Sequence, residues 1–189
     1  MYIRKGRDIA DDWMVYHKDF LTSGGKGHEY MKLNDTIISA DFTAAWNDTA
    51  PTSSVFSVGT DASVNTDTKL FVTYLFSGVE GYSKFGYFIG NGNANGTFVY
   101  TGFSPSFIMM KSDTSAYSWI TIDNARDPDN IANHRLWPNE TAAEGASEGI
   151  DFLANGFKLR GSGVGQNAGS GHMIYAAFAE TPFKYATAR

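Results

Sequence analysis

Short segments rich in aromatic and β-branched residues follow one another along nearly the whole chain, separated by clusters of Gly, Asn, Asp and Ser. Such segments suit a pleated, half-buried sheet, and the residues between them are those that tight turns prefer. The predicted strands are residues 1–5, 13–17, 37–39, 55–58, 70–76, 84–89, 97–101, 107–111, 118–123, 149–153, 156–160 and 172–180. Helix signals are confined to residues 39–46 and 139–143, each a turn or two long and starting at a capping-type residue. The pattern predicts an all-β fold, an antiparallel β-sandwich of the jelly-roll or lectin-like kind.

The second half of the chain repeats features of the first. When Lys5 is placed over Lys111, Trp13 falls on Trp119. Three further matches follow in the same order: MKLNDT (31–36) with LWPNET (136–141), FSVGTD (56–61) with FKLRGS (157–162), and FVTYLFS (71–77) with MIYAAFA (173–179). Ordered matches on strands and their flanking turns predict an internal repeat, that is, two similar β units. The alternative is that β-rich sequences resemble one another through composition alone.

The repeat predicts three parts: a first β unit at 1–77, a connecting β-hairpin at 78–106, and a second β unit with a C-terminal tail at 107–189. The turn of the hairpin would be GNGNANG (90–96), whose Gly and Asn residues tolerate positive φ. Residues 1–5 should pair with neighbours on both sides, because their counterpart 107–111 is internal.

The two copies differ in what precedes them. The second follows YTGFSPS (100–106), whereas nothing precedes the first. We therefore expect the chain to hold the last two copies of something longer, or to be a product with a shortened start. The alternative is that Met1 is the true initiator.

Charge and composition argue against several classes of protein. The net charge is -5 and the 15 Lys and Arg residues are scattered, so a nucleic-acid partner is not expected. The sequence contains no run of eighteen apolar residues, so it predicts no membrane-spanning helix. The chain has no cysteine, which excludes disulfides and thiolate metal sites.

No motif in the sequence predicts catalysis, a cofactor or a metal. GNGNANG and GSGVGQNAGSG (161–171) lack the spacing of a dinucleotide fingerprint, and a strand rather than a helix is expected after each, so both are interpreted as hairpin loops. The four histidines show no ligand spacing, and neither a GxSxG motif nor a distinctive carboxylate pair is present. We therefore predict a protein that is not an enzyme.

Four side chains are candidates for contact with a ligand. Trp46 and Trp137 lie near turns, where an exposed ring could stack on a sugar, although core packing is the commoner fate of tryptophan. Asp127 and Asp129 stand in the sequence DPDN. That sequence has too few oxygen ligands for a calcium loop and is better interpreted as an Asx-type turn.

Three long segments carry a family resemblance: residues 79–111 (VEGYSKFGYFIGNGNANGTFVYTGFSPSFIMMK), residues 119–160 and residues 175–184. They resemble a domain of unknown biochemical activity that is encoded, often in tandem, in genomes of tailed bacteriophages, especially marine phages and cyanophages. The resemblance implies a structural protein of the virion, assembled in the host cytoplasm, which acts as a tail fibre or appendage adhesin or as a capsid decoration. The expected partners are other virion proteins, further copies of the chain and a host surface glycan. The alternative is a carbohydrate-binding or carbohydrate-cleaving β-sandwich.

Overall fold

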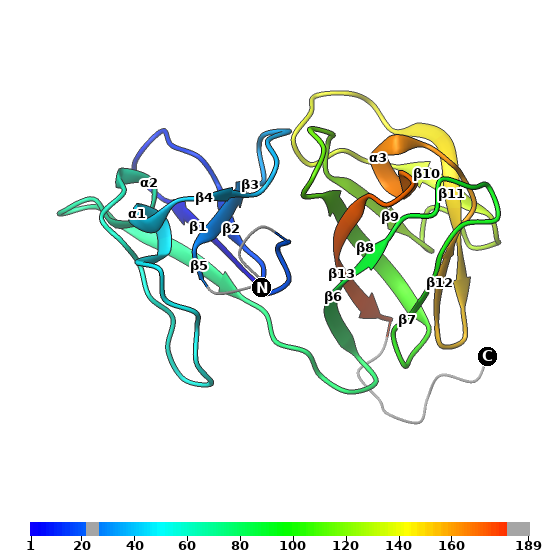
Figure 1. Cartoon of the computed structure of the whole chain (residues 1–189), viewed down its shortest axis with the longest axis horizontal. Coiled ribbons are helices and arrows are strands. Elements are labelled where there is room, and N and C mark those ends of the chain that lie inside the picture. The colour runs from blue at the N-terminus through cyan, green and yellow to red at the C-terminus, as the bar shows by residue number, and fades with distance from the viewer. Residues whose placement is uncertain (22–26, 181–189) are drawn as a thin grey trace. The chain divides into compact units, whose positions relative to one another are not determined.

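The computed structural model describes residues 1–21 and 27–180, and the chain divides into two compact units, Met1–Phe76 and Ser77–Arg189 (Figure 1). Below they are called unit 1 and unit 2. All sheets are antiparallel, so the predicted all-β class is confirmed. None of the described helices is long and apolar enough to cross a membrane.

Unit 1 is a single five-stranded sheet, in the order β4-β3-β2-β1-β5, with two one-turn helices. Its elements are β1 (Tyr2–Gly6), β2 (Met14–Tyr16), β3 (Glu29–Lys32), β4 (Ala40–Asp41), α1 (Thr43–Trp46), α2 (Ala62–Asn65) and β5 (Phe71–Leu75). Aromatic rings fill the core beneath the sheet. Tyr2 stacks on Tyr16 with ring centroids 4.7 Å apart, and Trp46 meets Tyr2 edge-on at 4.9 Å. These geometries are the favoured ones for aromatic pairs, so the rings fix how α1 packs on the sheet.

The first strand is paired on both sides, as the sequence predicts. β1 pairs antiparallel with β2 through Tyr2–Tyr16 and with β5 through Tyr2–Leu75. The backbone groups of β1 therefore find partners within unit 1.

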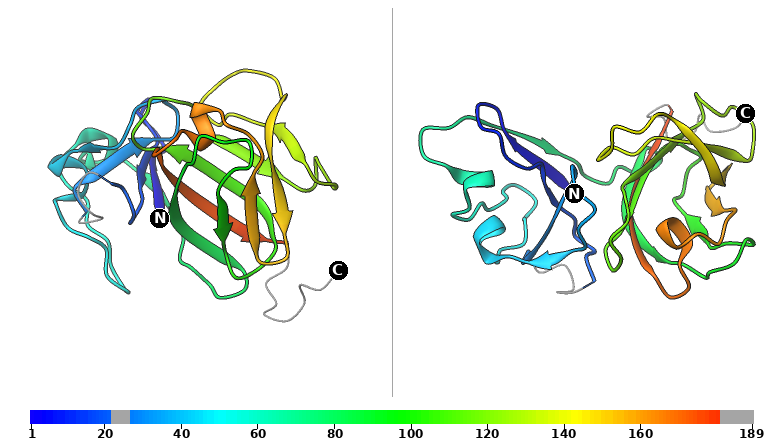
Figure 2. Two further views of the ribbon diagram at one scale, coloured as in Figure 1. Left: turned by 45° about the vertical axis from the view of Figure 1, so that its right-hand side comes forward. Right: turned by 90° about the horizontal axis from the view of Figure 1, so that it is seen from above.

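Unit 2 is a sandwich of two four-stranded sheets, with strand orders β6-β13-β8-β9 and β10-β11-β12-β7. Figure 2 shows the two sheets as facing layers within this unit. Its elements are β6 (Ser83–Ile89), β7 (Phe98–Tyr100), β8 (Pro105–Ser112), β9 (Ile120–Asp123), β10 (Ala132–Arg135), β11 (Gly145–Leu153), β12 (Gly156–Leu159), α3 (Val164–Asn167) and β13 (His172–Ala179). One buried cluster takes residues from both sheets, among them Ile108, Met110 and Tyr175 on one side and Ile150 and Phe157 on the other. Alternating inward side chains from two facing sheets are the core arrangement of a sandwich.

The predicted hairpin at 78–106 is not formed. β6 pairs with β13 and β7 pairs with β12, so the two strands belong to different sheets. The Gly/Asn tract between them crosses from one sheet to the other instead of returning beside β6. Its composition predicts a turn but not which sheet the chain enters next, which explains the error.

Residues 161–171 make the opposite crossing, from β12 to β13, and contain α3, so they are not a hairpin loop either. The two crossings bind each other: Gly90 N donates to Gly171 O (2.9 Å) and Ser170 N donates to Gly90 O (2.9 Å). A Cβ at Gly90 would lie 2.2 Å from Ala168 O, so glycine is required at this close approach.

Other boundaries also differ from expectation. Residues 37–39 and 55–58 are not strands, and 139–143 is not helical. Conversely, β3 (EYMK) and β10 (ANHR) form although their sequences are too polar to predict strands. Trp119 is buried as expected, whereas Trp13 is half-buried and stacks on Tyr74 at 6.4 Å.

Both units contain antiparallel pairings in the same register. Equivalent pairs are Tyr2–Tyr16 with Ile108–Ile122, Arg4–Met14 with Met110–Ile120, Tyr2–Leu75 with Ile108–Ala177, Gly6–Phe71 with Ser112–Met173, and Glu29–Asp41 with His134–Ala146. Two side-chain bonds also recur: Asn34 Oδ1 accepts from Trp13 N (2.9 Å) as Asn139 Oδ1 does from Trp119 N (2.8 Å), and Asn65 Nδ2 donates to Gly59 O (2.9 Å) as Asn167 Nδ2 does to Gly161 O (2.7 Å). The internal repeat remains a prediction, and these correspondences favour it.

Candidate functional site

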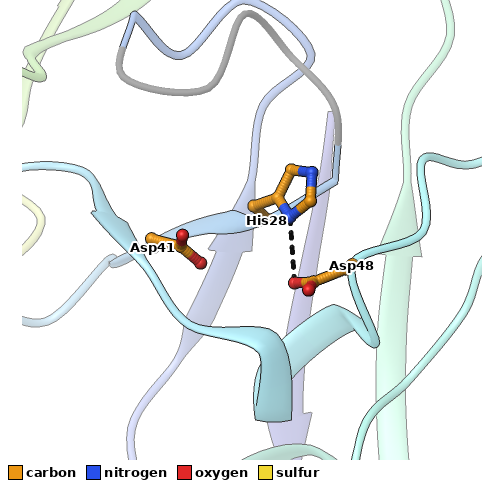
Figure 3. Close-up of side chains that lie close together, drawn as sticks. All are labelled: His28, Asp41 and Asp48. Carbon is orange, nitrogen blue, oxygen red and sulfur yellow. Dashed lines mark ion pairs between the residues drawn. The ribbon is translucent and has the colours of Figure 1, made fainter.

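A histidine and two aspartates converge at one edge of unit 1 (Figure 3). They are His28, Asp41 and Asp48, called the His28 cluster below. One ligand atom from each lies within 4.8 Å of the other two, and His28 Nδ1 is 3.0 Å from Asp48 Oδ1. An imidazole and two carboxylates are ligands that divalent transition metals accept.

Local backbone structure assembles the His28 cluster. Pairing of β3 with β4 sets Asp41 opposite Glu29, and Phe42 N donates to His28 O (2.8 Å). After α1 the chain turns through two left-handed residues, Asn47 and Asp48, with φ of 56° and 46°. This turn points Asp48 back toward His28, while Thr43 Oγ1 donates to its other oxygen (2.9 Å). Sequence reasoning missed the cluster because no spacing motif joins the three residues.

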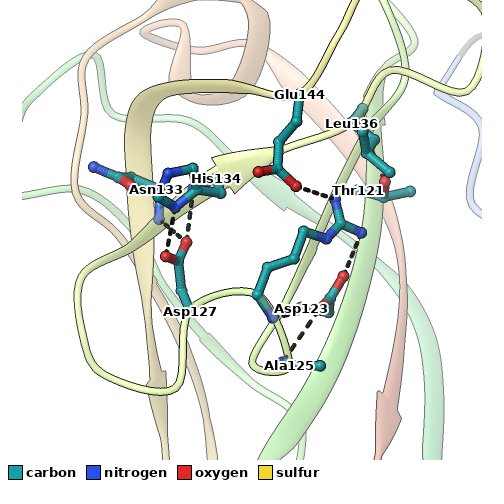
Figure 4. A network of polar contacts seen from close by, with 9 residues as sticks. Thr121, Asp123, Ala125, Asp127, Asn133, His134, Leu136 and Glu144 are labelled. Atoms are coloured by element: carbon teal, nitrogen blue, oxygen red, sulfur yellow. Dashed lines mark hydrogen bonds and ion pairs between the residues drawn. The ribbon is translucent and has the colours of Figure 1, made fainter.

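Asp127, a predicted ligand contact, holds the loop between β9 and β10 (Figure 4). Its carboxylate accepts from the backbone N–H groups of Asn133 and His134, both at 2.7 Å, and lies 2.6 Å from His134 Nδ1. Burial acts to raise the pKa of Asp127, but the hydrogen bonds from His134 and Asn133 outweigh it, and the net pKa lies below the ordinary value. The same hydrogen bond and the charge of Asp127 raise the pKa of His134.

A second carboxylate closes the start of this loop. Asp123 Oδ1 accepts from the backbone N–H groups of Ala125 (3.1 Å) and Arg126 (3.0 Å), an Asx-type turn. Arg126 forms an ion pair with Asp123 and reaches Glu144 Oε2 at 3.7 Å. Asp129 lies exposed in the same loop. These contacts show how the loop is held, whereas contact of Asp127 or Asp129 with a ligand remains a prediction.

The two predicted tryptophans lie in different units and different environments. Trp46 is fully buried, and its Nε1 donates to Glu29 O at 3.0 Å inside the core of unit 1. It is therefore a core residue and lacks the exposed ring face that stacking on a sugar requires. Trp137 is half-buried at the edge of the unit 2 core.

Trp137 lines a surface depression of about 360 Å³ together with Tyr117, Ser118, Ile120, Arg135, Glu140 and Gly165. The Arg135 guanidinium lies 5.8 Å from the centre of the Trp137 ring, within the range of a cation–π contact. Arg135 is 8% exposed, and burial lowers its pKa. Ser118 Oγ donates to Glu140, which orients that carboxylate. The depression thus combines two aromatic rings with a cation and an anion.

Comparison with known proteins assigns the chain to a family. No curated protein and no solved structure matches it significantly. The model of a family described as a domain of unknown function (DUF7483) matches residues 1–182, which cover unit 1 and the described part of unit 2. The chain therefore belongs to the DUF7483 family.

Proposed function

We propose that the protein is a non-enzymatic structural module of a bacteriophage virion, either a tail fibre or appendage adhesin or a capsid decoration. The observation that carries the proposal is the presence of two β units with the same strand registers, joined in one chain. Serial β modules provide a rigid scaffold on which exposed loops can be varied. The resemblance of residues 79–111, 119–160 and 175–184 to a phage-encoded domain supplies the association with the virion.

The test is to find the protein in particles. Purified virions would be analysed by quantitative mass spectrometry, and the protein would be located by cryo-electron microscopy. We expect it at a fixed number of copies per particle, on the capsid for a decoration or on the tail for an appendage. Detection in the host lysate alone, with none in purified particles, would refute the proposal.

A second candidate function is carbohydrate binding in the depression beside Trp137. Sugar rings stack on tryptophan and tyrosine, and paired carboxylate and guanidinium groups can bind their hydroxyls. In this depression the combination is formed by Tyr117, Arg135, Trp137 and Glu140. It would also suit an adhesin that recognises a host surface glycan.

A glycan array compares the wild-type chain with Trp137→Ala and with the control Tyr100→Ala, which removes an exposed ring elsewhere in unit 2. We expect loss of binding in Trp137→Ala and no change in the control. Equal binding by all three proteins, or no binding by any, would exclude this site. Degradation of a polysaccharide by the wild-type chain would instead indicate a carbohydrate-cleaving enzyme.

A further inference from the structure

The two units have matching strand registers but differ in how the last strand of each unit is paired. β5 and β13 are equivalent strands, since they pair with β1 and β8 in the same register. β13 is also paired along its other edge, by β6. Among the described residues, β5 has β1 as its one strand neighbour and ends the sheet.

Exposure at equivalent positions follows this difference. Tyr74 and Leu75 of β5 are 48% and 62% exposed, whereas Ala176 and Ala177 of β13 are 2% and 0% exposed. A sheet edge with exposed apolar side chains is a template for another strand, and proteins usually protect such edges. The outer edge of β5 is therefore a surface prepared for strand addition.

The order of segments along the chain indicates which strand would bind there. β6 comes from the segment that follows β5, the last strand of unit 1, and it pairs with the last strand of the next unit. The segment that follows β13, ETPFKYAT (180–187), resembles the corresponding EGYSKFGY (80–87) in its glutamate, its lysine and an aromatic residue after the lysine. By the same rule it would pair with the last strand of a following unit. Among the described strands of another copy, β13 is already paired with β6, whereas β5 has an open edge.

We propose that the edge of β5 binds residues 183–188 of a second copy of this chain as an added antiparallel strand, giving head-to-tail association. The β6–β13 register transfers directly: Lys84 opposes Ala177, Phe85 opposes Ala176 and Gly86 opposes Tyr175. The proposed pairs are Lys184 with Leu75, Tyr185 with Tyr74, Ala186 with Thr73, and Thr187 with Val72. The proposal does not depend on the virion role.

Side-chain sizes agree with this register. A Cβ at Gly86 would lie 2.9 Å from the Tyr175 hydroxyl, so a large side chain on β13 faces a glycine on β6. At the equivalent position of β5 the residue is Thr73, which is smaller, and the proposed partner is Ala186. Tyr185 and Tyr74 would form an aromatic cross-strand pair, a combination that stabilises antiparallel strands. A head-to-tail contact of this kind joins different surfaces of the two copies and builds rings or filaments.

The absence of native cysteine makes disulfide trapping specific. A full-length Tyr74→Cys chain would be mixed with an isotopically labelled Tyr185→Cys chain under mild oxidation. Residues directly opposed in antiparallel strands have Cβ atoms about 4.5–5.5 Å apart, close enough for a disulfide to form with little adjustment. The matched control replaces Tyr74→Cys with Ser54→Cys, a cysteine at another exposed position of unit 1. We expect the mixed 74–185 dimer to form faster than the 54–185 dimer.

Sedimentation of the unmodified chain over a range of concentrations provides the second measurement. We expect reversible association that is lost in Tyr185→Pro, which removes a backbone donor from the added strand, and retained in Tyr185→Phe. Residue 185 lies beyond the described residues, and circular dichroism of both variants provides the check that the two units remain folded. A chain that stays monomeric, association that survives Tyr185→Pro, or equal trapping at 74 and 54 would each overturn the proposal.

Discussion

Asn167 joins the two chain crossings at one end of the unit 2 sandwich, and replacing it with alanine should destabilise that unit strongly. The side chain is fully buried. Its Nδ2 lies within hydrogen-bond distance of Gly161 O (2.7 Å), Asn93 O (2.9 Å) and Asn91 Oδ1 (3.0 Å), and its Oδ1 accepts from Asn91 N (3.0 Å). The side-chain amide of Asn167 therefore forms hydrogen bonds with groups in both crossings.

The expected loss of stability follows from these bonds. Each net hydrogen bond contributes about 1 kcal/mol, and a buried partner left without one costs about 1–3 kcal/mol. Gly161 O is bonded inside the fold, whereas the Asn91 and Asn93 groups belong to a more exposed loop that water can reach. We expect Asn167→Ala to lower the free energy of unfolding of unit 2 by about 3 kcal/mol.

The equivalent residue of unit 1 is a matched control. Asn65 Nδ2 makes the corresponding bond to Gly59 O (2.9 Å), but its side chain is exposed. Asn65→Ala should therefore cost less than about 1 kcal/mol. Urea unfolding would be followed by tryptophan fluorescence and calorimetry, with separate transitions fitted for the two units if they appear. Equal losses in the two variants, or a loss in Asn167→Ala below that of a single bond, would refute the hydrogen-bond account.

Three further results are expected. Trp46→Ala should cost about 3–5 kcal/mol, because it empties a fully buried site, and calorimetry should show the loss in the transition of unit 1. The pKa of His134, measured by NMR, should lie above its ordinary 6.5 and return toward that value in Asp127→Asn. Because the pKa is raised in the folded state, the His134–Asp127 pair stabilises the fold at pH values below the unfolded-state pKa. That contribution is lost as pH rises through the folded-state pKa. EDTA should leave the thermal midpoint unchanged, since two of the three side chains of the His28 cluster are exposed, and a drop of several degrees would instead reveal a bound structural metal.

The sequence predicts those parts of the fold whose strands are themselves strongly apolar. The sequence predicts β13 and β6 because aromatic and aliphatic residues dominate them. The sequence does not predict β3 and β10, because their polar segments become strands only by pairing with neighbouring strands across a loop. The Gly/Asn crossings show the same limit, since local composition predicts a turn but carries no information about which sheet follows.

The candidate sites divide in the same way. Trp137 could be singled out as a large ring near a turn, but the same signal also selected Trp46, which packing places in the core. The His28 cluster depends on the β3–β4 register and on the left-handed turn at Asn47 and Asp48, neither of which a spacing rule captures.

The central place of β13 has a consequence for how unit 2 forms during synthesis. Of the described strands of unit 2 it is the last to be made, yet it separates β6 from β8 and pairs with both. Until residues 172–179 have left the ribosome, β6 and β8 each have an edge without a partner. Both edges can be paired only through contacts between distant parts of the chain. Nascent unit 2 should therefore be vulnerable to aggregation and to chaperone capture until its final strand inserts, and a stop codon placed before His172 should release an insoluble product.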